Sequence, residues 1–321
     1  MDELDRKLLY EISENADESM NKVAKKLRHS REVLDYRMKK LQKDGIVTGF
    51  QARINLSNFI YGGYIFLIQS SALDIKSEEK IIQKLKSNNK IQYIGKIGGE
   101  YDFIIGFTVK KLGELSETID EINSAFGKKK SSQTLLTTVK EIKDSFKTIF
   151  SKVDEPNDIV SMPSIDEKIK IDEIDKKILI SLGKNANIPS WRISDKVKIS
   201  DVAVRKRIEN LVKKKIILGF RTMVDLTKLN YQPYFIMIKM NSTNNKKYMG
   251  EFLKRNKDIT YSVKVAGRYD LILTVSVRDN KELKDFIYNF KSKFSNTILE
   301  TNILPLFEII YHAQLAEGFL E

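Results

Sequence analysis

The sequence DRKLLYEISENA at residues 5–16 returns as DKKILISLGKNA at residues 175–186, and the likeness continues without a gap to residues 56 and 226. Fourteen of the 52 aligned residues are identical. Farther along, GGEYD at 98–102 corresponds to AGRYD at 266–270, at an offset of 168 in place of 170. A repeat of this length indicates that one structural unit is written twice in the chain.

The composition favours a polyanionic partner and disfavours catalysis. The chain has 321 residues, enough for several domains, and a formal net charge of +13. A basic excess of this size points to nucleic acid first and to an anionic membrane surface second. There are no cysteines and only two histidines, which removes thiolate chemistry and most routes to zinc binding or histidine-dependent catalysis. We therefore expect no cofactor and no enzyme.

The chain carries no sign of a membrane segment or a secretory signal. No apolar run approaches the ~20 residues needed to span a bilayer. The N-terminus, MDELD, is acidic and lacks the apolar core of a signal peptide. We expect a cytoplasmic protein without a membrane partner.

Proline and charged residues between the repeats predict an extended linker over residues 151–170, which contains Pro156 and Pro163. The linker separates two units, each with a short helical domain followed by a mixed one. We assign the helical domains to residues 1–57 and 171–227. The mixed domains take residues 58–150 and 228–321.

Each helical domain has the pattern of three helices followed by strands. Apolar residues at helical spacing predict helices around residues 4–12, 20–27 and 34–41, and again in the second copy. Ser30 and Ser200 are placed to cap the third helix. Strands are expected at Gly49-Phe50 and near Arg53-Ile54, with equivalents in the second copy, so each copy would carry a two-stranded wing. This order predicts a winged helix-turn-helix.

The mixed domains follow the order strand, helix, strand, strand, helix, strand. In the first copy the predicted strands cover 64–68, 91–97, 103–109 and 134–142, with helices around 81–85 and 112–122. The second copy repeats this order. A βαββαβ domain is ferredoxin-like. The fold class is therefore α+β, with a winged helix-turn-helix domain and a ferredoxin-like domain, twice.

The motifs LDRKLL (4–9), VAKKL (23–27) and GIVTGF (45–50), followed by GEYD (99–102) before a strand, resemble the Lrp/AsnC (feast/famine) family of transcription regulators. The resemblance covers nearly the whole chain. It implies DNA binding and a RAM-type effector domain, in which sheets from two units pack together and small ligands such as amino acids bind at the seam. Two departures stand out: the family usually has one unit per chain, and Lys215 replaces the pre-wing glycine, Gly45.

The third helix of a helix-turn-helix lies in the major groove, where its N-terminal turns reach base edges. The side opposite the apolar stripe and its neighbours are therefore the candidate DNA contacts. In the first copy these are Ser30, Arg31, Glu32, Asp35, Tyr36, Arg37, Lys39 and Lys43. In the second copy they are Ser200, Val202, Arg205, Lys206, Arg207, Lys213 and Arg221.

The two candidate faces differ in chemistry. Arg205 could read guanine through O6 and N7, and Lys206 could do the same or contact phosphate. The carboxylates of the first copy could accept from cytosine N4, so the two helices should not read the same bases. A merely solvated helix face is the alternative, and for Arg37 and Arg207 an internal ion pair is as plausible as a phosphate contact.

The glycine turns supply the candidate effector-binding residues. They are Gly98, Gly99, Tyr101 and Asp102 in the first copy and Gly267, Arg268, Tyr269 and Asp270 in the second. Glycine permits close backbone approach, and Asp102 or Asp270 could accept from an ammonium group. The alternative is a tight hairpin whose aspartate caps its own turn.

We favour a sequence-specific transcription regulator that binds double-stranded DNA, with an amino acid as candidate effector. The chain would act as an intramolecular pseudo-dimer or as a homo-oligomer through the ferredoxin-like domains. The alternatives are an architectural protein that coats DNA and a sirohaem-decarboxylase-like enzyme. The enzyme is disfavoured because His312 is the only histidine of the mixed domains. Divergent reading faces predict an asymmetric operator, better specified under Arg205 and Lys206.

Overall fold

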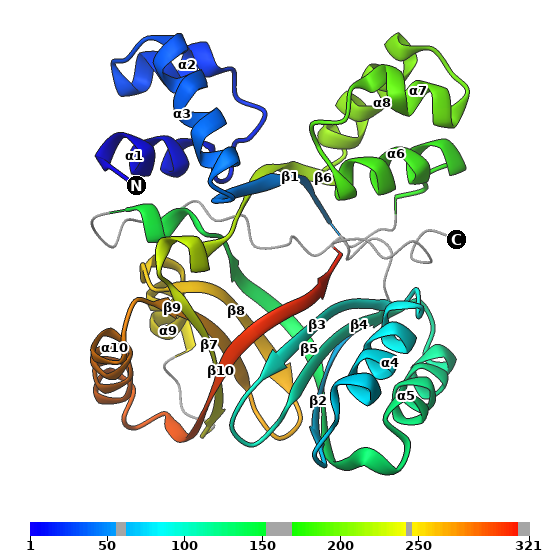
Figure 1. Ribbon diagram of the computed structural model, residues 1–321, viewed down its shortest axis with the longest axis vertical. Helices are drawn as coiled ribbons and strands as arrows, with labels where there is room; N and C mark the ends of the chain where they lie inside the picture. Colours follow the sequence, from blue (N-terminus) through cyan, green and yellow to red (C-terminus); the bar gives the residue numbers. More distant parts are fainter. Residues whose placement is uncertain (56–61, 152–168, 242–245, 314–321) are drawn as a thin grey trace.

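The computed structural model describes residues 1–55, 62–151, 169–241 and 246–313. Two helical heads sit above a β-barrel (Figure 1). Most of the predicted linker, residues 152–168, lies outside the described residues. Within the described ranges, no helix combines the length and the apolar character needed to cross a membrane.

Each head contains three helices at the predicted positions. They are α1 (Glu3–Ile12), α2 (Met20–Leu27) and α3 (Arg31–Lys43), then α6 (Glu173–Lys184), α7 (Ser190–Val197) and α8 (Asp201–Lys213). Ser30 Oγ accepts from Val33 N at 3.4 Å, and Ser200 Oγ accepts from Ala203 N at 3.2 Å. Both predicted caps are confirmed, and each satisfies a free backbone donor at the start of a third helix.

The two-stranded wing predicted within each copy is wrong. β1 (Val47–Ile54) and β6 (Ile217–Val224) are each one continuous strand, and they pair with each other in antiparallel fashion. Between the two expected strands, the sequence Phe50-Gln51-Ala52 offers no glycine, proline, asparagine or aspartate that would reverse the chain. Each strand therefore runs on and finds its hydrogen-bonding partner in the other copy.

Through this pairing, each strand contributes side chains to the hydrophobic core of the other copy's head. Ala52 and Ile54 of β1 pack in the core of the second head, and Val224 of β6 packs in the core of the first. A backbone hydrogen bond also crosses over, from Ala16 N to Phe220 O at 2.9 Å. Each head is completed by a strand of the other copy, so the two heads form one body.

The two mixed units have the predicted βαββαβ order. The first contains β2 (Gly62–Ser70), α4 (Ile75–Lys86), β3 (Ile91–Ile97), β4 (Phe103–Val109), α5 (Gly113–Phe126) and β5 (Lys130–Asp144). The second contains β7 (Gln232–Met240), α9 (Lys246–Arg255), β8 (Ile259–Ala266), β9 (Leu271–Val277), α10 (Asn280–Lys293) and β10 (Ile298–His312). Short 3₁₀ turns lie at η2 (Gly127–Lys129), η3 (Lys147–Phe150) and η4 (Leu226–Leu229).

The two ferredoxin-like sheets close into one barrel of strand order β10-β3-β4-β2-β5-β8-β9-β7. β5 pairs with β8, and β10 pairs with β3, so the last strand of each unit joins the second strand of the other. Closure leaves the barrel strands without open edges. The mixed domains therefore pair within one chain, which forms its own pseudo-dimer.

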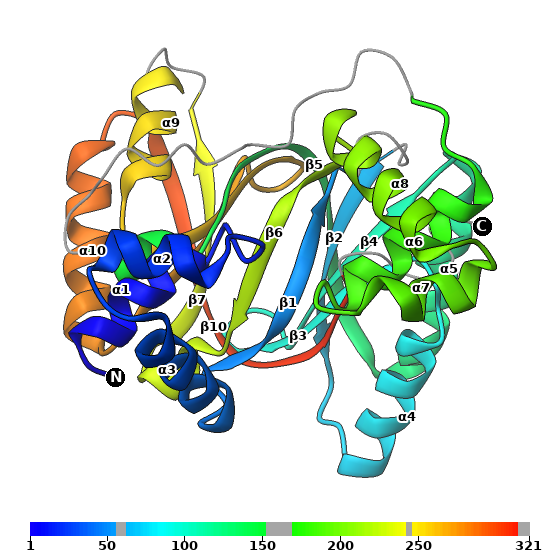
Figure 2. The same ribbon diagram turned by 90° about the horizontal axis from the view of Figure 1, so that it is seen from above.

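Alternating side chains divide the strands between the barrel interior and its outer face. Leu67 of β2 and Met237 of β7 share an apolar cluster drawn from both units. The neighbours of Leu67, Phe66 and Ile68, pack instead with residues of α4 and α5. α9 and α10 cover the equivalent face of the second unit. Figures 1 and 2 place these two helix pairs on opposite flanks of the barrel.

Candidate nucleic-acid interface and effector turns

The predicted reading faces of α3 and α8 are open to solvent. Leu34 and Leu41 of α3 are buried, as are the equivalent residues of α8. On the opposite side, the exposed residues are Glu32, Tyr36, Lys39 and Lys43 on α3 and Val202, Arg205, Lys206 and Lys213 on α8. The spacing of the apolar stripe therefore predicted correctly which sides of α3 and α8 are exposed to solvent.

The N-terminal halves of α3 and α8 carry the same two charges in opposite order. On α3, Arg31 Nε lies 3.2 Å from Asp35 Oδ2. On α8 the aspartate comes first, and Asp201 pairs with Arg205. These side chains are at least one-third exposed, and an exposed pair of this spacing contributes only about 0.3–0.5 kcal/mol. A phosphate or a base edge can therefore compete for either arginine, one turn apart on the two helices.

Arg37 and Arg207 make internal ion pairs. Arg37 Nη1 lies 3.2 Å from Asp5 Oδ1 and also contacts Asp2. The equivalent contacts of the second head join Arg207 to Asp172 and Asp175 at 2.7 and 2.8 Å. The pKa of Asp2 is lowered by the backbone hydrogen bond from Asp5 and by Arg37. Both arginines thus fasten the third helix to the start of the first.

Arg221, which we predicted to contact DNA, is buried and paired inside the protein, so that prediction is wrong. The residue is only 5% exposed, and its Nη1 donates to Asp144 Oδ2 at 2.6 Å. Residues of a strand alternate between its faces, and Arg221 falls on the face that meets the end of β5. Its guanidinium ties the β1–β6 sheet to the barrel.

Arg221 is part of a polar group between the heads and the barrel, here named the neck cluster: Glu14, Gln51, Arg53, Glu141, Asp144 and Arg221. Arg53 Nη1 lies 3.3 Å from Glu14 Oε2. Burial raises the pKa of Glu141 to about 8, and the charge of Asp144 adds to the effect. Burial also acts to raise the pKa of Asp144, but Arg221 and Arg53 hold it below its usual value. Sequence reasoning missed this cluster.

The aspartates of the glycine turns are held by neighbouring strands. Asp102 Oδ2 accepts from Ser70 N at 2.7 Å, and Asp270 Oδ2 accepts from Met240 N at 2.8 Å. Each carboxylate thus fastens its turn to the end of β2 or β7. The aspartates therefore have a structural role close to the hairpin alternative, although the donor belongs to the adjacent strand and not to the turn itself.

The glycines of these turns are explained by close packing. Gly99 and Gly267 have φ angles of +98° and +135°, which other residues rarely adopt. A Cβ on Gly98 would lie 2.6 Å from the ring of Phe307, and one on Gly267 would lie 3.0 Å from Leu135 O. The turns accordingly need glycine for packing as well as for backbone conformation.

Side chains of both turns meet in a polar group at the junction of the two copies, here named the seam cluster: Glu100, Tyr101, Thr134, Arg268, Tyr269 and Asn302. Arg268 pairs with Glu100 and donates to Tyr101 OH at 2.8 Å. Asn302 Nδ2 donates to Glu100 Oε2 at 2.6 Å. Both tyrosines are almost fully buried. Glu100 was not among the candidates; the sequence signal that could have pointed to it is its alignment with Arg268, a residue of opposite charge in the equivalent turn.

Two helix-turn-helix heads that share the β1–β6 sheet and are carried by paired ferredoxin-like domains define a DNA-binding protein. Residues 1–48 match the model for winged helix-turn-helix DNA-binding domains. Residues 171–212 match the model for the AsnC-type helix-turn-helix domain. Both copies are thus matched in their DNA-binding parts.

Known relatives specify the family. An HTH-type transcriptional regulator of Pyrococcus furiosus is 30% identical over 142 residues, which cover 44% of this chain and 95% of the relative. The regulator LrpA of Pyrococcus horikoshii is 34% identical over 121 residues, 37% of this chain and 84% of LrpA. The chain belongs to the Lrp/AsnC family of DNA-binding transcription regulators. Each relative covers less than half of it because the chain contains the unit twice.

A solved structure also shares the tandem architecture. The siroheme decarboxylase NirDL aligns with a TM-score of 0.63 and covers 99% of this chain and 97% of its own. The sequence identity is 11%, so the likeness concerns the fold. The two chains therefore share one overall fold along nearly their whole lengths.

Proposed function

We propose that this regulator reads an asymmetric DNA site, with a different helix in each half. The observation that carries the proposal is the reversed order of Arg31 and Asp35 on α3 relative to Asp201 and Arg205 on α8. Arginine binds guanine through O6 and N7, whereas a carboxylate accepts from cytosine N4. Helices that place their arginine one turn apart present different sequences to the major groove.

The connection between the heads supports joint binding to one duplex. β1 and β6 pair and complete each other's heads, so the two reading helices move as one body. Helix-turn-helix pairs bind half-sites about one helical turn apart. Once one head is bound, the other acts at a high effective concentration.

Binding to matched duplexes, followed by fluorescence anisotropy, tests the proposal. Arg205→Ala should lose about 1–3 kcal/mol of discrimination at a base pair in one half-site. Arg31→Ala should do so in the other half. Lys213→Ala should weaken binding to all sequences and reduce the slope of log K against log salt by about 1. Unchanged base preference in Arg205→Ala would show that α8 does not read the site.

The same assay separates a regulator from an architectural protein. A protein that coats DNA binds a selected and a random duplex with an affinity ratio near unity. Specific regulators favour their site by about 10³-fold or more. A ratio near unity would therefore replace our proposal with the architectural function.

We place the candidate amino-acid effector at the seam cluster. The carboxylate of Glu100 and the guanidinium of Arg268 are chemically matched to the ammonium and carboxylate of an amino acid. Calorimetric titration with L-amino acids should show saturable binding that is lost in Arg268→Met. Binding that persists in this variant would move the effector elsewhere. The fold shared with NirDL makes a tetrapyrrole the competing ligand, which a change in siroheme absorbance would reveal.

A further inference from the structure

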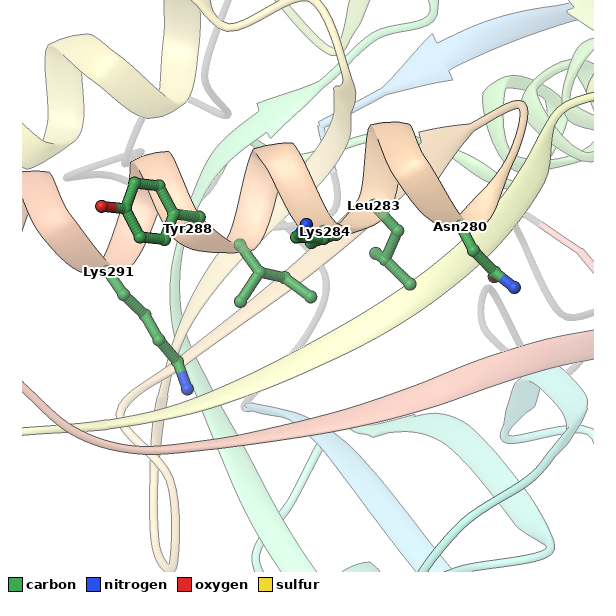
Figure 3. Close-up of a pocket in the computed structure, with 6 residues that line it drawn as sticks. Asn280, Leu283, Lys284, Tyr288 and Lys291 are labelled. Atoms are coloured by element: carbon green, nitrogen blue, oxygen red, sulfur yellow. The ribbon is translucent and has the colours of Figure 1, made fainter.

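Helix α10, on one flank of the barrel, carries an apolar hollow open to solvent. It has a volume of about 470 Å³ and is lined by Asn280, Leu283, Lys284, Ile287, Tyr288 and Lys291 (Figure 3). Tyr288 is 72% exposed, and Leu283 and Ile287 are only half-buried. An aromatic ring beside two aliphatic side chains at the surface is typical of a protein–protein contact.

Helix α5 is the equivalent helix of the first unit, and it keeps the apolar positions while changing the charge. Leu115 and Ile119 correspond to Leu283 and Ile287 at an offset of 168, and nearby Leu112 is 60% exposed. α5 contains four acidic residues and no lysine or arginine. α10 contains four lysines and two acidic residues. The duplicated faces have therefore become complementary in charge.

We infer that α10 of one molecule binds α5 of a second copy of this chain. The two helices lie on opposite flanks of the barrel (Figures 1 and 2). The contact therefore joins the basic helix on one flank of a molecule to the acidic helix on the opposite flank of the next. A contact between two different surfaces forms a ring or an open filament, whereas a contact between identical surfaces closes a dimer.

The charges that would meet are accessible on both helices. Lys284 and Lys291 are exposed on α10, and Asp120 is exposed on α5. The side chain of Glu117 is 69% exposed, with its Oε2 3.6 Å from Lys90 Nζ. Pairing α10 with α10, or α5 with α5, brings like net charges together. Only the mixed pairing combines apolar burial with Coulomb attraction.

Charge reversal on each helix tests the inference by sedimentation of the full chain without DNA. Wild type should associate with increasing concentration, and added salt should weaken the association. Lys284→Glu/Lys291→Glu should weaken it by about tenfold or more, and so should Glu117→Lys/Asp120→Lys. An equimolar mixture of the two variants should associate again, because each reversed helix then meets an opposite partner. Lys22→Glu/Lys25→Glu, on the exposed side of α2, is the charge-matched control and should behave like wild type.

Three results would overturn the inference: a monomeric wild type at tens of micromolar, a reversed variant that associates as well as wild type, or a mixture that fails to associate. Unchanged circular dichroism and unchanged affinity for DNA show that the α10 and α5 variants are folded, and circular dichroism alone serves for the α2 control, which lies in a DNA-binding head. Loss of association in a variant that passes these tests therefore reports on the contact between α10 and α5.

Discussion

Removing the guanidinium of Arg221 should destabilise the protein through the charge it leaves behind. Arg221 is 5% exposed and lies 2.6 Å from Asp144, whose carboxylate is largely buried. In Arg221→Met the apolar part of the side chain is retained, but Asp144 loses its closest cation. Breaking a buried pair on one side typically costs about 3–5 kcal/mol. We expect the lower end, about 3 kcal/mol, because Arg53 still acts on Asp144.

Arg205→Met is the matched control, because Arg205 is exposed and its partner Asp201 keeps about one-third of its side chain in contact with solvent. We expect it to change the free energy of unfolding by less than about 1 kcal/mol. In DNA binding we expect the opposite order, with the larger effect in Arg205→Met. Arg205→Met should lose the proposed contact to DNA, whereas folded Arg221→Met should keep the salt dependence of wild type, because Arg221 is buried.

Urea denaturation at several pH values measures the effect. Arg221 holds the pKa of Asp144 below its usual value, so the stabilisation by this pair is present above about pH 4 and is lost as the pH falls through the lowered pKa. In Arg221→Met, burial raises the pKa of Asp144 without Arg221 to oppose it, so the carboxyl takes up a proton at a higher pH than in wild type. The stability deficit of the variant should for this reason shrink between pH 7 and about pH 4. Equal stability of the two variants at pH 7, or a smaller salt slope in Arg221→Met, would refute the reasoning.

Three further predictions concern Glu141, the positive-φ position before each strand of the heads, and the Glu100–Arg268 pair. Burial raises the pKa of Glu141 to about 8, so the stabilisation that this residue provides is full below the unfolded pKa of 4.5 and declines as the pH rises to 8. The thermal midpoint of Glu141→Gln should therefore fall less than that of wild type between pH 4.5 and 8. An equal fall in the two proteins would contradict this. Lys215 has a φ of +55°, so Lys215→Gly should raise the free energy of unfolding by about 1 kcal/mol, while Gly45→Lys at the equivalent position should lower it. A lower free energy of unfolding in Lys215→Gly would argue against backbone strain at residue 215. Glu100→Arg should lower the thermal midpoint, because it places a second positive charge beside Arg268. The double variant that exchanges the two residues should regain much of the lost thermal midpoint. If it does not, the ion pair is not the cause of the loss.

The sequence predicted the elements better than it predicted how they pair. The helices of the heads followed from apolar spacing and from Ser30 and Ser200, because both signals act within a few residues. The two-stranded wing failed because the pairing of β1 with β6 joins residues far apart in the sequence. The barrel order has the same origin: βαββαβ was readable in each unit, but closure depends on β5 meeting β8 and β10 meeting β3.

The candidate residues show the same difference between local signals, which the sequence contains, and contacts between distant residues, which it does not. The exposed faces of α3 and α8 were located by helical geometry alone. Arg221 was assigned to the DNA-binding surface because an arginine on a strand is expected to be exposed. Its burial depends on Asp144, a partner that the sequence alone does not identify. The role of Asp102 depended on Ser70, and that of Glu100 on Arg268, each brought near only by the fold.

Selection of bound duplexes from a random library, followed by sequencing, tests most directly that one chain reads DNA with two different heads. The account predicts a site without palindromic symmetry, in which two unlike half-sites lie about one helical turn apart. Repeating the selection with Arg205→Ala should erase preferences in one half only. A perfect palindrome, with both halves responding alike to Arg205→Ala, would contradict the account.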